Sequence, residues 1–131
     1  MAISRRKTRK ISIGSTFIGG NAPIATQSMY ATKTTDVKTT LWQIKLLQDA
    51  GADLIRIAVD SKAEVEALKE ISKQTDANLV VDLQENYRLA ELAAPYITKF
   101  RYNPGHLHHH QKSVSVEDKV KYLANLSLIH I

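Results

Sequence analysis

The sequence predicts an α/β fold in which parallel β-strands alternate with α-helices. Apolar runs typical of buried strands lie at residues 54–60, 79–84 and 99–105, and segments with apolar residues at helical spacing separate them. Each run carries charged or polar side chains toward its carboxyl end. Because ligands of parallel α/β folds bind beyond the carboxyl ends of the strands, this pattern also predicts a binding site there.

The chain begins with a segment, residues 1–22, that we expect to form a short antiparallel β-hairpin. Ile11 and Ile13 alternate with polar residues, and Gly14 and Ser15 are typical of a tight turn. Such a hairpin can cap the bottom of a barrel that later strands build.

A first core strand is expected over residues 23–29 and a first helix over residues 36–50. The helix has apolar residues at helical spacing, and Gly51 is a typical helix stop. Gln27 and Ser28 lie near the end of the strand, and alternation within the strand does not settle which of them faces a site.

The remaining elements repeat this order of strand and helix. After the strand at residues 54–60, Ser61 and Glu64 form the S-x-x-E pattern of a capping box, which marks the start of a second helix. There follow a strand from about residue 78, a short helix over residues 87–94, a strand from residue 97 and a helix that Ser115 and Asp118 cap.

A repeat of roughly 25 residues per strand and helix fits either a (β/α)₈ barrel or a doubly wound parallel sheet. A complete barrel takes about 250 residues, so we expect the 131 residues to supply the N-terminal half of a TIM-type (β/α)₈ barrel, about four βα units over residues 23–125. Residues 126–131 contain no Lys, Arg, Asp or Glu and no helix stop or turn signal. We expect them to be a non-native tail.

Polar side chains gather on one face of the predicted sheet, because residues two apart in a strand share a face. Ile55, Ile57 and Val59 are expected to face the helices. Several cations on the opposite face are costly to bury without anionic partners, and the single carboxylate there does not neutralise them all. We therefore predict an anion site, with a structural ion pair inside the sheet as the alternative. The face collects Arg56, Asp82, Gln84, Lys99, Arg101 and Asn103.

Composition limits the classes of function. The chain has no Cys, which excludes disulfides and cysteine-ligated metal clusters within these residues. A net charge of +5 permits nucleic-acid binding, but the basic residues spread over most of the chain. The basic start, which includes Arg5 and Lys10, lacks a following apolar signal core, and no apolar run approaches the roughly 20 residues that cross a bilayer. We expect a soluble cytoplasmic protein with neither membrane nor nucleic acid as a partner.

A histidine-rich segment follows the fourth strand, from His106 to His110. Imidazole is a common metal ligand, but adjacent histidines on one loop rarely converge on a single ion, and no Cys is available as a further ligand. We expect no metal there. His106 is instead a candidate to line the site, together with Gln84 and Lys99.

Taken together, these segments resemble the 4-hydroxy-3-methylbut-2-enyl diphosphate synthases of the non-mevalonate isoprenoid pathway. The resemblance runs from Arg5 to about Lys121 and rests on RRKTRKISIG, IGGNAPIATQSM, TKTTD, QDAGADLIRIAV, VVDLQENYRLA and KFRYNPG, in that order. It implies a barrel that binds 2-C-methyl-D-erythritol 2,4-cyclodiphosphate. It also implies a C-terminal [4Fe–4S] domain that these residues do not include, electrons from ferredoxin or flavodoxin, and a homodimer in which the cluster domain of one subunit closes over the barrel of the other.

Matching by motif, Arg56 of LIRIAV and Arg101 and Asn103 of FRYNPG correspond to family residues that hold the substrate's diphosphate. The guanidinium fork suits this task because it pairs with phosphate oxygens and keeps its charge. Asp82 of VVDLQ matches an acidic position and is expected to orient a neighbouring Arg or a substrate hydroxyl.

The chain departs from the family pattern at several positions. Gln84 stands where many members have His, and an amide hydrogen-bonds but does not shuttle a proton. Tyr30 and Ala31 replace Thr and Asn of a common Met-Thr-Asn-Thr run, and Asp60 replaces a frequent Pro. These departures affect the first loops that follow the strands.

The sequence thus predicts the N-terminal part of an iron–sulfur oxidoreductase, with positioning and charge neutralisation of a diphosphate as its share of the work. Without Cys, we expect no turnover by these residues alone. Two alternatives stay open: a cluster-free phosphate-binding barrel related to pterin-dependent synthases, and a basic α/β module for nucleic acid, whose binding would fall steeply with salt.

Overall fold

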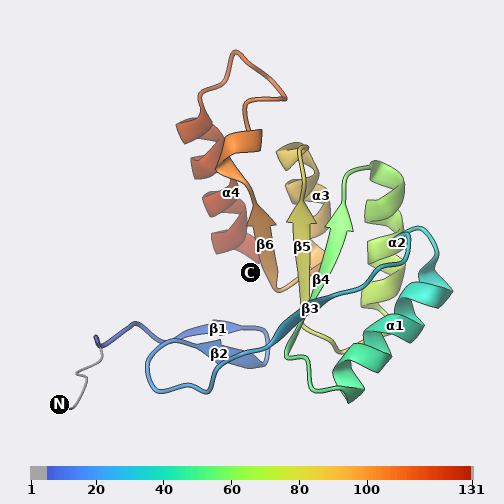
Figure 1. Cartoon of the computed structure of the whole chain (residues 1–131). Helices are drawn as coiled ribbons and strands as arrows, with labels where there is room; N and C mark the ends of the chain where they lie inside the picture. Colours follow the sequence, from blue (N-terminus) through green and yellow to red (C-terminus); the bar gives the residue numbers. More distant parts are fainter. Residues whose placement is uncertain (1–5, 131) are drawn as a thin grey trace.

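The computed structural model describes residues 6–130, in which a parallel sheet of four strands has helices on one face and an antiparallel hairpin near its lower end (Figure 1). The strand order is β3-β4-β5-β6, so each strand pairs with its neighbours in the sequence. A doubly wound sheet would reverse its order at a switch point. The sequential order and the single helical layer confirm the prediction of half a barrel.

The N-terminal hairpin is present as predicted. β1 (Ile11–Ile13) pairs with β2 (Thr16–Ile18), and the turn between them contains Gly14 at φ +57°. A Cβ at Gly14 would lie 2.0 Å from Oδ1 of Asn78, so both the backbone angle and the close approach require glycine.

The hairpin is attached to the amino ends of the central strands. Ile13 packs with Leu54 and Val80 in a small apolar cluster of its own. The buried side chain of Asn78 accepts from Ser15 N at 3.1 Å and donates to Ser15 Oγ at 2.9 Å. The hairpin therefore covers the lower part of the sheet face that the helices leave open.

The first strand and helix follow. β3 (Gln27–Met29) is shorter than the strand expected over residues 23–29, because Pro23 has no N–H to donate and Thr26 N donates to the side chain of Asp53 at 2.8 Å and not to a backbone carbonyl. α1 (Val37–Asp49) has the predicted extent: the side chain of Asp36 caps its N-terminus, and Gly51 follows it at φ +89°.

The capping box that begins the second helix is confirmed. β4 (Leu54–Val59) leads to α2 (Lys62–Ser72), where Glu64 N donates to Ser61 Oγ at 3.3 Å. The carboxylate of Glu64 in turn accepts from Ser61 Oγ at 3.0 Å.

The third unit contains the largest departure from a regular helix. After β5 (Leu79–Leu83), the segment expected as one short helix is divided into the 3₁₀ turn η1 (Tyr87–Leu89), α3 (Ala90–Ala93) and the 3₁₀ turn η2 (Ala94–Tyr96). Pro95 supplies no N–H, which favours the tighter terminal turn.

The last unit consists of β6 (Lys99–Tyr102), the 3₁₀ turn η3 (Pro104–His106) and α4 (Val116–His130). Ser115 and Asp118 cap α4 as predicted, with Asp118 N donating to Ser115 Oγ at 3.0 Å. The backbone of residues 126–130 continues α4, so the non-native origin of residues 126–131 stays a prediction, as do the domain boundaries. Ile131, and Arg5 of the basic start, lie outside the described residues.

The main core lies between the sheet and the helices. Ile55, Ile57 and Val59 of β4 pack there together with Leu68 and Ile71 of α2. This confirms the predicted assignment of strand faces. No helix of the described residues is long and apolar enough to cross a membrane.

Candidate functional site

The candidate site lies on the face of the sheet that is turned away from the helices. Strand register places Ala58, Asp82 and Arg101 side by side in one row across β4, β5 and β6. Arg56 and Lys99 belong to the row below, on either side of Val80. Because register partners in a parallel sheet point to the same side, these side chains share the open face.

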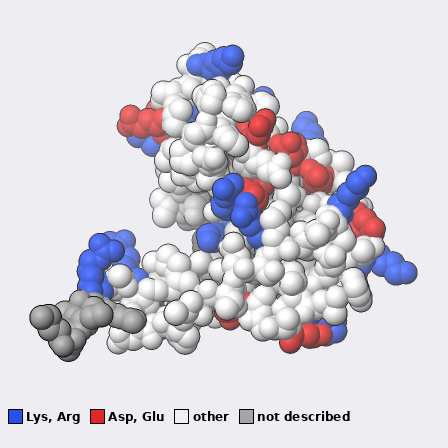
Figure 2. Space-filling model, in the orientation of Figure 1, with Lys and Arg blue, Asp and Glu red and all other residues white. Residues whose placement is uncertain are grey.

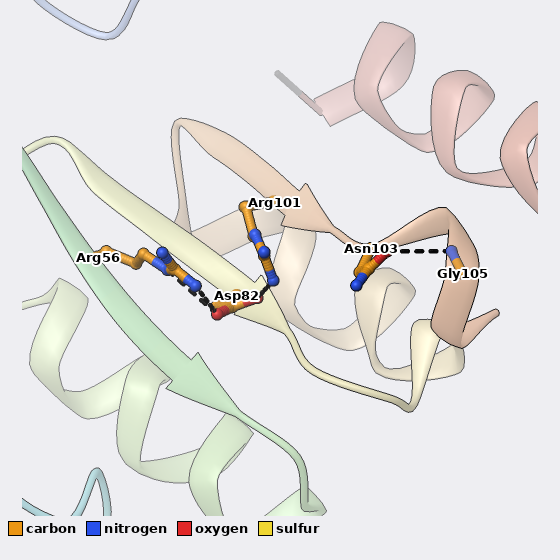
Figure 3. Close-up of polar contacts among 5 residues, drawn as sticks. All are labelled: Arg56, Asp82, Arg101, Asn103 and Gly105. Carbon is orange, nitrogen blue, oxygen red and sulfur yellow. Dashed lines mark hydrogen bonds and ion pairs between the residues drawn. The ribbon is translucent and has the colours of Figure 1, made fainter. Parts of the chain in front are cut away.

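Asp82 is the centre of this group. Its side chain is buried, and its two oxygens are divided between two guanidinium groups (Figure 3). Oδ1 accepts from Arg101 Nη1 at 2.9 Å, and Oδ2 accepts from Arg56 Nε at 3.1 Å and also from Arg56 Nη2. The ion pair that we considered as the alternative is therefore present, and it includes both arginines.

This ion pair does not use up the charge or the donors of the site. The two arginines and Lys99 bring three positive charges to one carboxylate. The side chains of Arg56 and Arg101 are 27% and 43% exposed. In the described residues, no hydrogen bond uses Arg56 Nη1 or Arg101 Nη2. A guanidinium has five N–H donors, so both groups can keep Asp82 and still bind an anion.

The distribution of charge on the visible surface agrees with this local excess. Lys and Arg side chains gather beside a carboxylate near the middle of the face, over β5 and β6, while other basic side chains are scattered along the rim (Figure 2). The basic residues of this face thus converge on Asp82, which lies next to the carboxyl end of β5, the side of the sheet where ligands of parallel α/β folds bind.

Asn103 lies just beyond the end of β6. It is the N-cap of η3, and its Oδ1 accepts from Gly105 N at 3.0 Å (Figure 3). The cap fixes the side chain and leaves the amide nitrogen as the group that can donate to a ligand.

The structure does not bring Gln84 and His106 into contact with the carboxylate of Asp82. Both residues are exposed at loop positions that follow strands. The ring of His106 stacks on His109, with centroids 5.4 Å apart, and His109 Nδ1 lies 3.4 Å from Glu85 Oε1. The described residues contain no group of three or more His, Cys, Asp or Glu that could hold a metal ion.

The strand register also shows which of Gln27 and Ser28 lies on the open face of the sheet. Gln27 pairs with Leu54, and Met29 pairs with Arg56, so Gln27 and Met29 lie on the open face while Ser28 faces the helices. Met29 is 42% exposed, and no feature of its sequence context predicts a place near the site. Met29 is identified as a neighbour of Arg56 only by the register of β3 against β4.

Tyr30, one of the positions at which the chain departs from the family pattern, lies in the core and not at the candidate site. Tyr30 is buried among core residues, and its hydroxyl lies 2.5 Å from Thr34 Oγ1, which donates to Ala58 O at 2.8 Å. Burial raises the pKa of Tyr30 to about 12. The phenol thus ties the loop after β3 to the core side of β4.

Comparison with known proteins gives one consistent result. The model of the GcpE TIM-barrel domain family matches residues 8–127. A 4-hydroxy-3-methylbut-2-en-1-yl diphosphate synthase (flavodoxin) of Rhodopirellula baltica is 55% identical over 123 residues, which are 94% of this chain and 32% of the relative.

Proteins with the same name in other bacteria are also similar. The protein of Nitratiruptor sp. is 47% identical over 105 residues, 80% of this chain and 30% of the relative. That of Helicobacter pylori is 42% identical over 121 residues, 92% of this chain and 34% of the relative. The chain therefore spans about a third of the length of the curated relatives that it matches.

Proposed function

The chain belongs to the GcpE TIM-barrel domain family, and we propose that it forms the substrate-binding N-terminal part of a 4-hydroxy-3-methylbut-2-en-1-yl diphosphate synthase. In this proposal the whole protein opens the ring of 2-C-methyl-D-erythritol 2,4-cyclodiphosphate reductively and removes a hydroxyl, and its product is an allylic diphosphate. The residues described above contribute binding and charge neutralisation.

One observation carries the proposal: the pairing of Arg56 and Arg101 with a single buried carboxylate, which lies next to the carboxyl end of β5. A cyclic diphosphate presents oxygens that match the guanidinium donors. In the proposed complex, Asp82 keeps its bonds and holds the two guanidinium groups apart. A preorganised pair of this kind loses little freedom when the ligand binds.

The neighbouring residues take supporting roles in this proposal. The amide of Asn103 donates to a diphosphate oxygen, and Lys99 adds positive charge from the row below. Gln84 and His106 line the opening of the site. As an amide, Gln84 can hydrogen-bond to the substrate but does not transfer a proton.

The residues of this chain do not fit the iron–sulfur cluster that the family implies. Such clusters are held by cysteine thiolates, and the sequence contains no Cys. We propose that the cluster, the site for the electron donor and the contacts of a homodimer belong to other parts of the protein. Flavodoxin, which the names of the relatives give, is the donor we propose. We expect no turnover by these 131 residues alone.

Calorimetric titration with the cyclic diphosphate tests the proposal. We expect Arg101→Gln to weaken binding at least tenfold, the effect of about one hydrogen bond to a charged group. Arg88→Gln is the matched control, because Arg88 is an exposed arginine of η1 and lies beside residues of the helical layer such as Leu92 and Tyr122. A folded wild-type chain that does not bind, or equal affinity in the Arg101 variant, would overturn the proposal and leave the ion pair with a structural role only.

A further inference from the structure

Lys119 is a fully buried lysine that the proposed site does not use. It lies in the first two turns of α4 and is 1% exposed. Its Nζ donates to Leu107 O at 2.6 Å and also to His110 O, and it lies 5.4 Å from the centre of the Tyr87 ring. The ammonium thus has two carbonyls as hydrogen-bond partners and one aromatic ring as a neighbour.

This position is unfavourable for a cation on two counts. Burial removes the ammonium from water, and none of the ion pairs of the described residues includes Lys119. The N-terminus of a helix also carries a partial positive charge, which opposes a cation there. An apolar side chain would fill the same space without either cost, so the specific contribution of Lys119 is its bonds to the two carbonyls.

Both carbonyls belong to the loop that joins β6 to α4. The loop begins with Asn103 and the turn η3, and it includes the histidine segment. The loop is also anchored by the buried side chain of Leu107, by a hydrogen bond from the Tyr87 hydroxyl to Gln111 Oε1, and by the exposed pairing of His109 Nδ1 with Glu85 Oε1. Gln111 has φ +51°. Lys119 therefore holds the loop at two points, one on each side of the histidine pair at 108 and 109.

We propose that Lys119 is a positioning residue for the diphosphate site: its buried ammonium fixes the loop after β6 so that Asn103 faces the anion. The inference rests on the proposed function, since the orientation of Asn103 matters only if an anion binds beside Arg101. Lys119 itself does not touch the ligand. Its effect passes through the backbone of residues 104–107, where His106 N bonds Asn103 O at 2.9 Å.

Binding of inorganic pyrophosphate to the 131-residue chain provides the test. We expect Lys119→Met, which keeps the length and the apolar stem, to weaken binding about tenfold, because the loop that carries the capped Asn103 side chain then loses its two bonds to Lys119 and no longer keeps that side chain in one position relative to Arg101. Lys121→Met is the matched control: Lys121 lies on the same helix, is exposed, and pairs with Glu117 of that helix at 2.9 Å. The control should bind pyrophosphate as the wild type does.

A double-mutant cycle separates positioning from a general loss of stability. If Lys119 acts through Asn103, then Asn103→Ala should cost much less affinity in the Lys119→Met background than in the wild type. Fully additive effects, or unchanged affinity in a folded Lys119→Met variant, would overturn the inference and leave the proposed function standing. A wild-type chain that does not bind pyrophosphate would overturn both.

A second measurement needs no variant and covers the case in which Lys119→Met does not fold. By linkage, a loop that assists binding must itself become more stable when the anion binds. Hydrogen exchange at the amides of His106, Leu107 and His109, which are bonded within the loop, should slow when pyrophosphate is added to the wild type. Unchanged exchange at saturating pyrophosphate would contradict the inference.

Discussion

Arg101 and Asp82 are register partners on neighbouring strands, and Arg101 Nη1 donates to Asp82 Oδ1 at 2.9 Å. The bond therefore runs across the sheet at one level, whereas Arg56 reaches the other oxygen from the row below. This division of one carboxylate between two arginines sets the separation of the guanidinium groups. It also explains how two cations are held near each other on an open sheet face.

Replacing Asp82 should leave the repulsion between the guanidinium groups of Arg56 and Arg101 uncompensated. Asp82→Asn keeps the shape but removes the charge, and we expect the free energy of unfolding to fall by about 1–3 kcal/mol. Chemical denaturation measures the change. Asp49→Asn is the control, because the ion pair of Asp49 with Lys45 is exposed and should contribute less than about 0.5 kcal/mol. Equal stability of Asp82→Asn and the wild type would show that the arginines do not need their counterion.

Gly14 should be one of the two glycines that are hardest to replace, together with Gly19, whose added Cβ would lie 2.1 Å from Arg9 O. Gly14→Ala combines a positive φ with a Cβ placed 2.0 Å from Asn78 Oδ1, so we expect a loss of more than about 2 kcal/mol in the free energy of unfolding. Gly51→Ala is the control: φ is +89°, but nothing lies within 4 Å of its Cβ, and we expect a loss of about 1 kcal/mol. Thermal or denaturant melts compare the two. Equal losses in the free energy of unfolding would mean that the hairpin moves to make room for the Cβ without a further loss of stability.

Alkaline titration should detect two tyrosines whose pKa values are raised. Burial raises the pKa of Tyr30 to about 12, and burial together with the hydrogen bond to Glu91 raises that of Tyr122 to about 12. The folded state then keeps protons that the unfolded state releases near the ordinary value of 10, so stability should be constant below pH 10 and fall as pH rises toward 12.

Ultraviolet absorbance of the phenolate measures this titration directly. In Tyr30→Phe, one late-titrating group should be lost and the alkaline decrease in stability should become smaller. Titration of all tyrosines of the wild type at the ordinary pKa, with the fold intact, would contradict the prediction.

The histidine side chains should matter little for anion binding. Ala at positions 108, 109 and 110 removes a contact of His108 with Gly105 O and the pairing of His109 with Glu85, both of which are exposed. The carbonyl of residue 110, which Lys119 binds, is backbone and remains. We therefore expect the triple variant to bind the cyclic diphosphate within about twofold of the wild type. A large loss in calorimetric titration would instead assign an imidazole to the site.

Several features of the candidate site could be predicted from the sequence alone. The common face of Arg56, Asp82 and Arg101 follows from the two-residue period of a strand, which depends on local backbone geometry alone. The caps at Ser61 and Ser115 are equally local, because donor and acceptor lie three residues apart.

Other features depend on contacts between distant parts of the chain. The orientation of Gln27 and Met29 requires the register with β4, and the hairpin's attachment to Asn78 joins residues 63 apart in the sequence. Asp82 serves as the counterion of both arginines, with one oxygen for each. This arrangement depends on the strand register and on the side-chain rotamers.

The sequence by itself determined the order of elements, the faces of β4, β5 and β6 and the family of the chain, since periodicity and motifs are properties of neighbouring residues. Only the tertiary structure decided which cations share Asp82, that Lys119 is buried beneath the loop after β6, and that Tyr30 belongs to the core. The physical reason is that burial and ion pairing depend on contacts between distant parts of the chain. The residue pattern of a single strand or helix does not specify those contacts.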